Sequence, residues 1–450
     1  MEVWSKDDKI NGMSTKQRLV RGVRSVLPAG AVRTLEETYR KGRIKLISAS
    51  YGNPAKGLKV IAVTGTNGKT TTVSYINAIL KEAGFKTAMF TTAVIEVAGE
   101  AKLNDLNATV ASTQRMQQFF RDAKHAGVDY VVLEITSHAL DQHKLDSVPI
   151  EAAVMTNLTQ DHLDYHKTME NYAAAKAKLF KKEPRFMVLN RDDSWFEYFD
   201  QFVASEQKIT YGKTDDADAK IEYLKLYKKG SEARVVIDTQ TKLELATALP
   251  GEYNVYNMTA AASLAYLLGV NLTDIVEGVA NLEGVPGRFE YVTKDTPYEV
   301  VVDYAHTPDA LEKFLEAARS VTKNRVILVF GATGDRDKGK RPIMGEIATR
   351  LADRVVLTDD ESYSENPQAI RDQVLEGVPD TKMVKVTEVG DRRAAIEKAL
   401  SIARKGDMVL ITGMGHEQYR IVNGERLPWN DGDVVREIVA AQNTKKPLGK

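Results

Sequence analysis

The chain has 450 residues, no cysteine, and 62 basic side chains that balance 62 acidic ones. This length is enough for roughly two to four domains, each with a core of its own. The lack of cysteine excludes a disulfide framework, a thiolate zinc site and a cysteine nucleophile, and the balanced charge argues against a protein that binds nucleic acid over its whole surface.

Apolar stretches are short throughout the chain. None approaches the roughly 20 residues that a membrane-spanning helix needs, and the first residues, MEVWSKDDKINGMS, lack the apolar stretch of a secretory signal. The sequence therefore predicts a cytoplasmic protein without a transmembrane segment.

The N-terminal segment, residues 1–57, is short and basic, with 11 Lys or Arg and 5 Asp or Glu among its first 50 residues. Five apolar residues recur at the three- to four-residue spacing of one helix face: Leu19, Val20, Val23, Val26 and Leu27. We predict a short helical segment that packs on the main body. A helix that binds a membrane surface or an acidic partner is the alternative interpretation.

From Leu58 on, short β-branched runs alternate with amphipathic stretches of helical length, which predicts parallel sheets covered by helices on both faces. The predicted strands are Lys59–Val63, Asp129–Glu134, Ala152–Thr156, Phe186–Asn190, Glu299–Asp303, Val326–Phe330, Arg354–Thr358 and Met408–Thr412. Predicted helices include Thr71–Ala83, Arg115–His125, Glu170–Lys181 and Arg392–Arg404. Residues 208–248 differ, because two alternating runs flank a turn at Gly230 and predict antiparallel strands.

Glycine and proline near Gly284–Gly287 mark a domain boundary. We therefore predict an α/β protein with a central ATPase-type domain over residues 58–286, built on a mostly parallel sheet. A Rossmann-like α/β domain over residues 287–450 follows it.

The strongest local motif is VIAVTGTNGKTTT, in which a strand leads into a glycine-rich turn and then a helix. Such a turn directs backbone N–H groups and a helix N-terminus at phosphate oxygens. Lys69 would reach the terminal phosphates and the Thr70 hydroxyl would bind Mg²⁺. The phosphate-binding candidates are Gly65, Thr66, Asn67, Gly68, Lys69, Thr70 and Thr71. An ordinary strand-to-helix turn is the alternative, but it does not need lysine followed by three threonines.

GTNGKTT resembles the phosphate loop of the Mur ligase family, the ATP-dependent amide-forming enzymes of peptidoglycan synthesis, to which folylpolyglutamate synthetase is related. Further motifs resemble the family in their usual order: LEITSHALDQHKL, TNLTQDHLDYHKTMENYAAAKAKLF, GEYNVYNMTAAASLAYLLG, GRFE, VVDYAHTPDALEKFL, FGATGDRDKGKRPIMG and GMGHEQY. The resemblance extends over residues 58–440 and is greatest to the members that add the third amino acid to a UDP-N-acetylmuramoyl dipeptide.

The resemblance implies that ATP phosphorylates a carboxylate and that an amine then attacks the acyl phosphate. It places one Mg²⁺ at Thr70 and Glu134 and a second at His162. It also matches Lys176 to a lysine that reacts with CO₂ to form a carbamate near the metals. The catalytic candidates are thus Lys69, Glu134, His162 and Lys176. Taken alone, Lys176 would instead belong to a solvated helix face.

Four further residues resemble the family's ATP contacts. Asn254 and Asp303 match adenine and ribose contacts, Arg288 matches an arginine directed at phosphate, and His306 lies beside them in sequence. The alternative for Asp303 is a buried polar anchor at the start of the C-terminal domain.

For the acceptor amino acid, the resemblance implies that Arg336 binds a carboxylate, that Glu417 receives the side-chain ammonium and that Gly413 lines the pocket. Members that use meso-diaminopimelate carry DNPR where this chain has Asp360-Glu361-Ser362-Tyr363. Tyr363 thus replaces an arginine for the distal carboxylate, and Asp360 and Glu361 add negative charge. We therefore expect a cationic acceptor such as L-lysine rather than meso-diaminopimelate.

For the donor, the resemblance implies that a UDP-muramoyl dipeptide contacts Ser112, Thr113, Thr136, Ser137 and Lys144. Family members with this function carry a separate UDP-binding domain before the phosphate loop. Because residues 1–57 lack its strand pattern, we expect uridine recognition to be reduced, to use the basic segment or to come from elsewhere.

Two rival functions remain at this point. The first is another amide ligase of the same superfamily, either folylpolyglutamate-like or acting on a different cell-wall precursor. The second is a non-catalytic nucleotide-binding subunit. We also expect a monomer without a nucleic-acid partner, whose two large domains close over the substrates.

Overall fold

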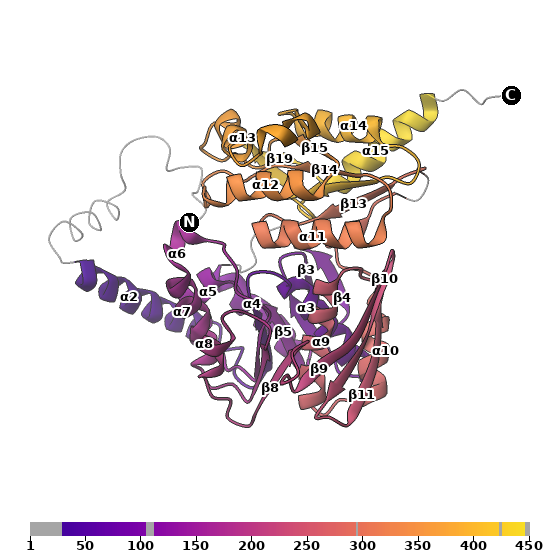
Figure 1. The fold of residues 1–450 in the computed structure, drawn as a ribbon. Coiled ribbons are helices and arrows are strands. Elements are labelled where there is room, and N and C mark those ends of the chain that lie inside the picture. The colour runs from indigo at the N-terminus through magenta and orange to yellow at the C-terminus, as the bar shows by residue number, and fades with distance from the viewer. Residues whose placement is uncertain (1–28, 105–111, 294–295, 423–424, 446–450) are drawn as a thin grey trace.

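The computed structural model describes residues 29–104, 112–293, 296–422 and 425–445 (Figure 1). The predicted helix face at residues 19–27 lies outside these ranges. The described chain begins with helix α2 (Ala29–Ser50), and its remainder forms two large α/β bodies.

The first body is built on a sheet of eleven described strands in the order β11-β10-β9-β8-β7-β6-β1-β5-β2-β3-β4. Its centre is parallel and contains β1 (Lys59–Thr64), β2 (Thr87–Phe90), β5 (Tyr130–Glu134), β6 (Ala152–Met155), β7 (Phe186–Asn190) and β8 (Gln207–Gly212). The short strands β3 (Val94–Val97) and β4 (Glu100–Leu103) extend one edge in antiparallel pairing. These central strands are apolar on both faces, as expected for a sheet buried between two helical layers.

The other edge of this sheet carries the predicted antiparallel strands: β9 (Ala219–Tyr227), β10 (Gly230–Ile237) and β11 (Thr241–Thr247). Strand β11 alternates buried and exposed side chains because only one of its faces packs on the core. The antiparallel prediction for residues 208–248 is therefore confirmed, except that β8 pairs in parallel with β7 and β9.

Helices cover both faces of the first sheet. One hydrophobic core packs beneath α3 (Lys69–Glu82), α9 (Glu252–Leu267) and α10 (Leu272–Ala280). The core on the opposite face packs beneath α4 (Thr113–His125), α5 (Ser137–Asp141), α7 (Met169–Phe180) and α8 (Phe196–Asp200). The short helix α6 (Leu163–His166) precedes α7. Because the strands are parallel, their carboxyl ends lie along one edge, where ligands bind in such folds.

The second body has a six-stranded sheet in the order β12-β13-β17-β14-β15-β16. Its strands are β12 (Glu290–Tyr291), β13 (Glu299–Asp303), β14 (Val326–Phe330), β15 (Arg354–Leu357), β16 (Val386–Glu388) and β17 (Met408–Thr412). Helices α11 (Pro308–Val321), α12 (Lys340–Leu351) and α13 (Pro367–Leu375) contribute to the core on one face, and α14 (Arg392–Ile402) and α15 (Asp431–Lys445) to that on the other. A 3₁₀ helix, η2 (Asp380–Lys385), and a hairpin of β18 (Tyr419–Val422) and β19 (Glu425–Pro428) complete it.

The eight predicted strands and four predicted helices are all present, with ends that differ by at most two residues. The fold is thus mixed α/β, as predicted. In Figure 1 the second body lies above the first, with α11 facing it. Within the described ranges, no helix combines the length and the apolar character needed to span a bilayer.

Candidate active site

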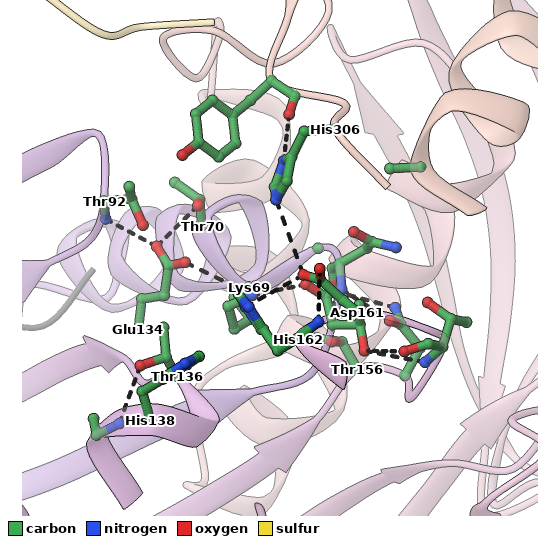
Figure 2. Close-up of a pocket in the computed structure, with 18 of the residues that line it drawn as sticks. Lys69, Thr70, Thr92, Glu134, Thr136, His138, Thr156, Asp161, His162 and His306 are labelled. Atoms are coloured by element: carbon green, nitrogen blue, oxygen red, sulfur yellow. Dashed lines mark hydrogen bonds and ion pairs between the residues drawn. The ribbon is translucent and has the colours of Figure 1, made fainter. Parts of the chain in front are cut away.

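A large cavity of about 2650 Å³ is lined by both bodies and by α2. Its walls include the phosphate loop, the carboxyl ends of β5 and β13, and the segment after β13. Figure 2 shows a close-up of a pocket in which Lys69, Thr70 and Glu134 lie near Asp161 and His162, with His306 pointing toward them. Most of the predicted nucleotide-site residues therefore meet in one place.

The phosphate loop connects β1 directly to α3, whose N-cap is Gly68. Gly68 has φ 83°, and a Cβ on it would lie 2.3 Å from Oδ1 of Asn257, so glycine is required there. Lys69 begins the helix, and its Nζ donates to the Thr66 carbonyl at 2.8 Å. Burial lowers the pKa of Lys69, against the raising effect of Glu134. The loop thus brings a helix N-terminus and a lysine to one point, as phosphate binding needs.

Glu134 ends β5 and is buried beside the phosphate loop. Its Oε2 accepts from the Thr70 hydroxyl and from the Thr92 backbone N–H, both at 2.9 Å, and its Oε1 lies 4.0 Å from Nζ of Lys69. Two oxygen ligands from a hydroxyl and a carboxylate, completed by phosphate and water, suit Mg²⁺. The Thr70–Glu134 pair therefore fits the first predicted metal position.

The second predicted metal position is less complete. His162 adopts φ 56°, and its Nε2 lies 3.3 Å from Oδ2 of Asp161. Burial lowers its pKa to about 3, so the ring is neutral and able to bind a metal. However, no group of three or more His, Asp or Glu among the described residues is gathered tightly enough to hold an ion without further ligands.

Asp161, on the first body, lies close to two basic side chains of the second body, and the sequence did not predict this. It is buried, and its carboxylate lies 3.7 Å from Nζ of Lys340 and 4.0 Å from Nε2 of His306, both from the second body. Lys340 is itself only 2% exposed. The acid directly before His162 and the second lysine of GDRDKGKRP were the available signals, but only the fold shows that they meet.

Lys176 lies on α7 and is 1% exposed, so the interpretation of it as part of a solvated helix face is wrong. Its Nζ donates to the Gly65 carbonyl at 2.7 Å. Burial, and next the charge of Lys69, lower its pKa well below 10.5. Lys178, in contrast, is partly exposed and pairs with Asp141 at 2.7 Å.

The predicted ATP contacts divide into two groups. Arg288, Asp303 and His306 line the cavity, whereas Asn254 is buried and donates to the Pro250 carbonyl at 2.8 Å. Asn257, one turn after Asn254 on α9, lines the cavity in its place.

Asp303 accepts backbone N–H groups of Phe289 and Ala305, both at 2.8 Å. It therefore anchors the start of the second body as well as lining the cavity. Arg288 donates from Nη2 to the Thr70 hydroxyl at 3.0 Å and so links that body to the phosphate loop.

The acceptor residues gather at the carboxyl end of the second sheet. Arg336 and Tyr363 line the cavity, with the guanidinium carbon 5.1 Å from the ring centroid. The Tyr363 hydroxyl donates to Glu361 at 2.7 Å. Gly413 has φ 110°, and a Cβ there would lie 2.4 Å from Oδ2 of Asp360.

Glu417 is buried close to Asp360 and Glu361 and accepts from the Tyr304 hydroxyl at 3.2 Å. Burial, then the charges of Glu361 and Asp360, raise its pKa to about 9. Such a carboxylate cluster favours an incoming cation.

Of the predicted donor contacts, Ser112, Thr113, Thr136 and Lys144 line the cavity. Ser112 and Thr136 also cap α4 and α5 by accepting from backbone N–H groups. Ser137 is buried, and its hydroxyl lies 2.9 Å from Nε2 of His166, so its side chain is engaged away from the cavity.

Comparison with known proteins gives two family matches. Residues 63–265 match the Mur ligase middle domain, and residues 287–415 match the Mur ligase, glutamate ligase domain. The chain is 39% identical over 405 residues to UDP-N-acetylmuramoyl-L-alanyl-D-glutamate–2,6-diaminopimelate ligase 1 of Clostridium acetobutylicum, covering 90% of this chain and 82% of the relative.

Two solved structures show that the fold alone does not distinguish between two kinds of ligase. One of a UDP-N-acetylmuramoyl-L-alanyl-D-glutamate–2,6-diaminopimelate ligase has 35% identity and TM-score 0.60, and the match covers 86% of this chain and 79% of that one. Folylpolyglutamate synthase of Mycobacterium tuberculosis, solved with ADP and AMPPCP, has TM-score 0.66 at only 17% identity, covering 90% and 95%. The fold is therefore common to both kinds of ligase, and sequence identity separates them.

Proposed function

Because this chain belongs to the Mur ligase family and is an ATP-dependent amide ligase, we propose that it adds meso-diaminopimelate to UDP-N-acetylmuramoyl-L-alanyl-D-glutamate. The observation that carries the proposal is the 39% identity, over 90% of the chain, to a relative with that named substrate pair. The cavity supports it, because the phosphate loop, most of the predicted donor contacts and two acceptor residues, Arg336 and Tyr363, line one space. Glu417 and its two acidic neighbours are buried behind that lining.

The expected preference for L-lysine needs correction, because the relatives named above use 2,6-diaminopimelate. That expectation gave too much weight to the replacement of one arginine by Tyr363. Both amino acids carry the distal ammonium that the cluster around Glu417 favours, so negative charge there does not separate them. Arg336 lies over the Tyr363 ring at the cavity wall, and its guanidinium can donate to a carboxylate, whereas the Tyr363 hydroxyl already donates to Glu361.

In the proposed reaction, the donor carboxylate oxygen attacks the γ-phosphorus of ATP and releases ADP. The acceptor amine then attacks the acyl carbon and releases phosphate, forming the amide. Lys69 and the N-terminus of α3 bind the phosphates and stabilise charge on the transferred group. Thr70 and Glu134 would hold Mg²⁺, which when bound neutralises phosphate charge.

Two hydrogen bonds between the bodies lie beside the phosphate loop, where the proposed reaction takes place. Arg288 reaches Thr70 from the second body, and Nδ2 of Asn67 donates to Asp309 at 2.7 Å across the same boundary. An acyl phosphate formed between them would be shielded from hydrolysis.

We further propose that Lys176 is carbamylated. Only a neutral amine attacks CO₂, and burial, with the charge of Lys69, lowers the pKa of Lys176 and so favours its neutral form. Nζ forms a bond to the CO₂ carbon and loses a proton, which converts a buried amine into an anion. That anion would balance the charge of Lys69 and offer a metal ligand to the region of His162, whose pKa is lowered by burial and also by the charge of Lys176.

The proposed function is tested by measuring phosphate release from ATP with UDP-muramoyl-L-alanyl-D-glutamate and single amino acids, with the product identified by mass spectrometry. We expect meso-diaminopimelate to exceed L-lysine in kcat/KM by about tenfold or more, since a lost carboxylate partner is worth over 1.4 kcal/mol. Preference for L-lysine would contradict the acceptor assignment. Phosphate release only with another donor class would contradict the whole proposal.

Acceptor binding should strengthen as pH rises. In the empty pocket Glu417 is protonated below about pH 9, whereas a bound ammonium favours its carboxylate, so binding releases a proton. The Kd of meso-diaminopimelate is therefore expected to fall by up to about tenfold per pH unit between roughly pH 7 and 9 and to level off above.

Calorimetric titrations of wild type and Glu417→Gln check this expectation. The acceptor's own amino groups titrate in the same range but affect both proteins equally, so the difference between them isolates Glu417. Parallel pH profiles for the two proteins would show that Glu417 does not receive the ammonium.

A further inference from the structure

Helix α2 forms part of the cavity wall. Glu36, Tyr39, Arg40, Arg43 and Ile44 line the same cavity as the phosphate loop. In Figure 1, α2 lies on the side of the first body that carries α5, α6 and α7. The reaction proposed above gives no role to this helix.

Contacts with the first body hold the C-terminal half of α2 in place. The Ser48 hydroxyl donates to Oε1 of Gln117 on α4 at 3.2 Å, and Ile44 is buried. Just past the helix, the Tyr51 ring lies 5.4 Å from the guanidinium carbon of Arg121, also on α4. Arg40 and Arg43, one or two turns earlier on α2, therefore belong to a helix that is held against the first body.

Arg40 and Arg43 are spaced i, i+3, so they lie on one face of the helix. Arg40 reaches α6, where it opposes the effect of burial and of Asp141 on the pKa of Tyr165. Nη2 of Arg40 is 4.0 Å from Glu36, with both side chains partly exposed, and such pairs are weak enough for a phosphate to displace. Arg115 and Lys144 add positive charge to the same cavity.

We propose that Arg40 and Arg43 bind the diphosphate of the muramoyl donor. The inference rests on the proposed function, because it needs a donor whose carboxylate points at Lys69. The diphosphate of that donor lies at the opposite end of the molecule from its carboxylate, and α2 lines the cavity on the donor side, near Tyr165. Guanidinium groups match phosphate oxygens in bidentate geometry.

The test compares Arg40→Glu/Arg43→Glu with Lys41→Glu/Lys45→Glu, which makes the same change of charge on α2 at exposed positions outside the cavity lining. Each protein is assayed with UDP-muramoyl-L-alanyl-D-glutamate and with muramoyl-L-alanyl-D-glutamate lacking the diphosphate. For the diphosphate donor, the arginine variant should raise KM about tenfold or more and leave KM for ATP unchanged. For the other donor, both variants should match wild type.

Equal KM values for the arginine variant and the lysine control would overturn the inference while leaving the proposed function intact. So would an equal loss with both donors, which a merely structural role of α2 predicts. Inactivity of wild type with the diphosphate donor would instead contradict the proposed function. Circular dichroism checks that Arg40→Glu/Arg43→Glu is folded. If it is not, the single variants Arg40→Gln and Arg43→Gln replace it, and each should raise the KM of the diphosphate donor severalfold.

Discussion

Replacing Lys176 with alanine is expected to lower ligase kcat by about 100- to 1000-fold, the range seen when one preorganised electrostatic group is removed. Lys176 is buried, donates to the Gly65 carbonyl of the phosphate loop, and has a strongly lowered pKa. If its carbamate balances the charge of Lys69 and ligates metal beside His162, alanine removes both contributions. Added bicarbonate should therefore not restore turnover.

The measurement is single-turnover phosphate release at saturating substrates, with Lys178→Ala as the matched control. Lys178 lies on the same helix but is partly exposed, so its loss should change kcat less than about twofold. ¹³C-labelled bicarbonate should give a carbamate NMR signal in wild type and none in Lys176→Ala. Near-full activity of Lys176→Ala would refute the carbamate, and a signal that persists in it would assign the label elsewhere.

Asp431→Ala is expected to lower the free energy of unfolding by about 3–5 kcal/mol, the cost of leaving one charge of a buried ion pair without its partner. Asp431 and Arg392 are both 0% exposed. Arg392 donates from Nε and Nη2 to the two carboxylate oxygens at 2.8 and 2.6 Å, and Nη2 also donates to the Thr412 carbonyl at 2.8 Å. The alanine variant would leave this guanidinium buried and uncompensated.

Urea unfolding monitored by circular dichroism measures the change. The control is Arg392→Met/Asp431→Leu, which removes both charges and should recover most of the lost stability, because apolar replacements of a buried pair are often neutral or stabilising. If the single and double variants lose the same free energy of unfolding, then packing rather than charge pairing accounts for the loss. Because Thr412 precedes Gly413 of the acceptor pocket, the double variant should still raise the KM of meso-diaminopimelate.

Most of the secondary structure could be predicted because the pattern is strongly periodic. Central strands such as Lys59–Thr64 are buried beyond their first residue and mostly apolar, and most of them are followed by a helix. The phosphate loop could be predicted as well, since glycines, Lys69 and Thr70 at fixed spacing have few other uses. These features depend on residues that are neighbours in the chain.

The prediction of the acceptor amino acid was wrong, because the acceptor pocket depends on residues that are not neighbours in the chain. It included Arg336 and Glu417, but it rested chiefly on the replacement of an arginine by Tyr363 within four consecutive residues, although the pocket is formed by segments far apart in sequence. Arg336 follows β14, whereas Glu417 follows β17, and those strands are adjacent only in the folded sheet. One local substitution therefore did not decide which acceptor is bound, and the named relatives overturn the lysine prediction.

The sequence by itself determined the α/β architecture, the phosphate loop and the family, because local periodicity and spaced motifs carry that information. Only the tertiary structure decided that Lys176 is buried, that Asn257 rather than Asn254 lines the cavity, that Asp161 meets Lys340, and that α2 contributes to the cavity wall. Burial and charge neighbours arise from contacts between distant segments, and these set the pKa of a lysine or a carboxylate more strongly than its sequence neighbours do.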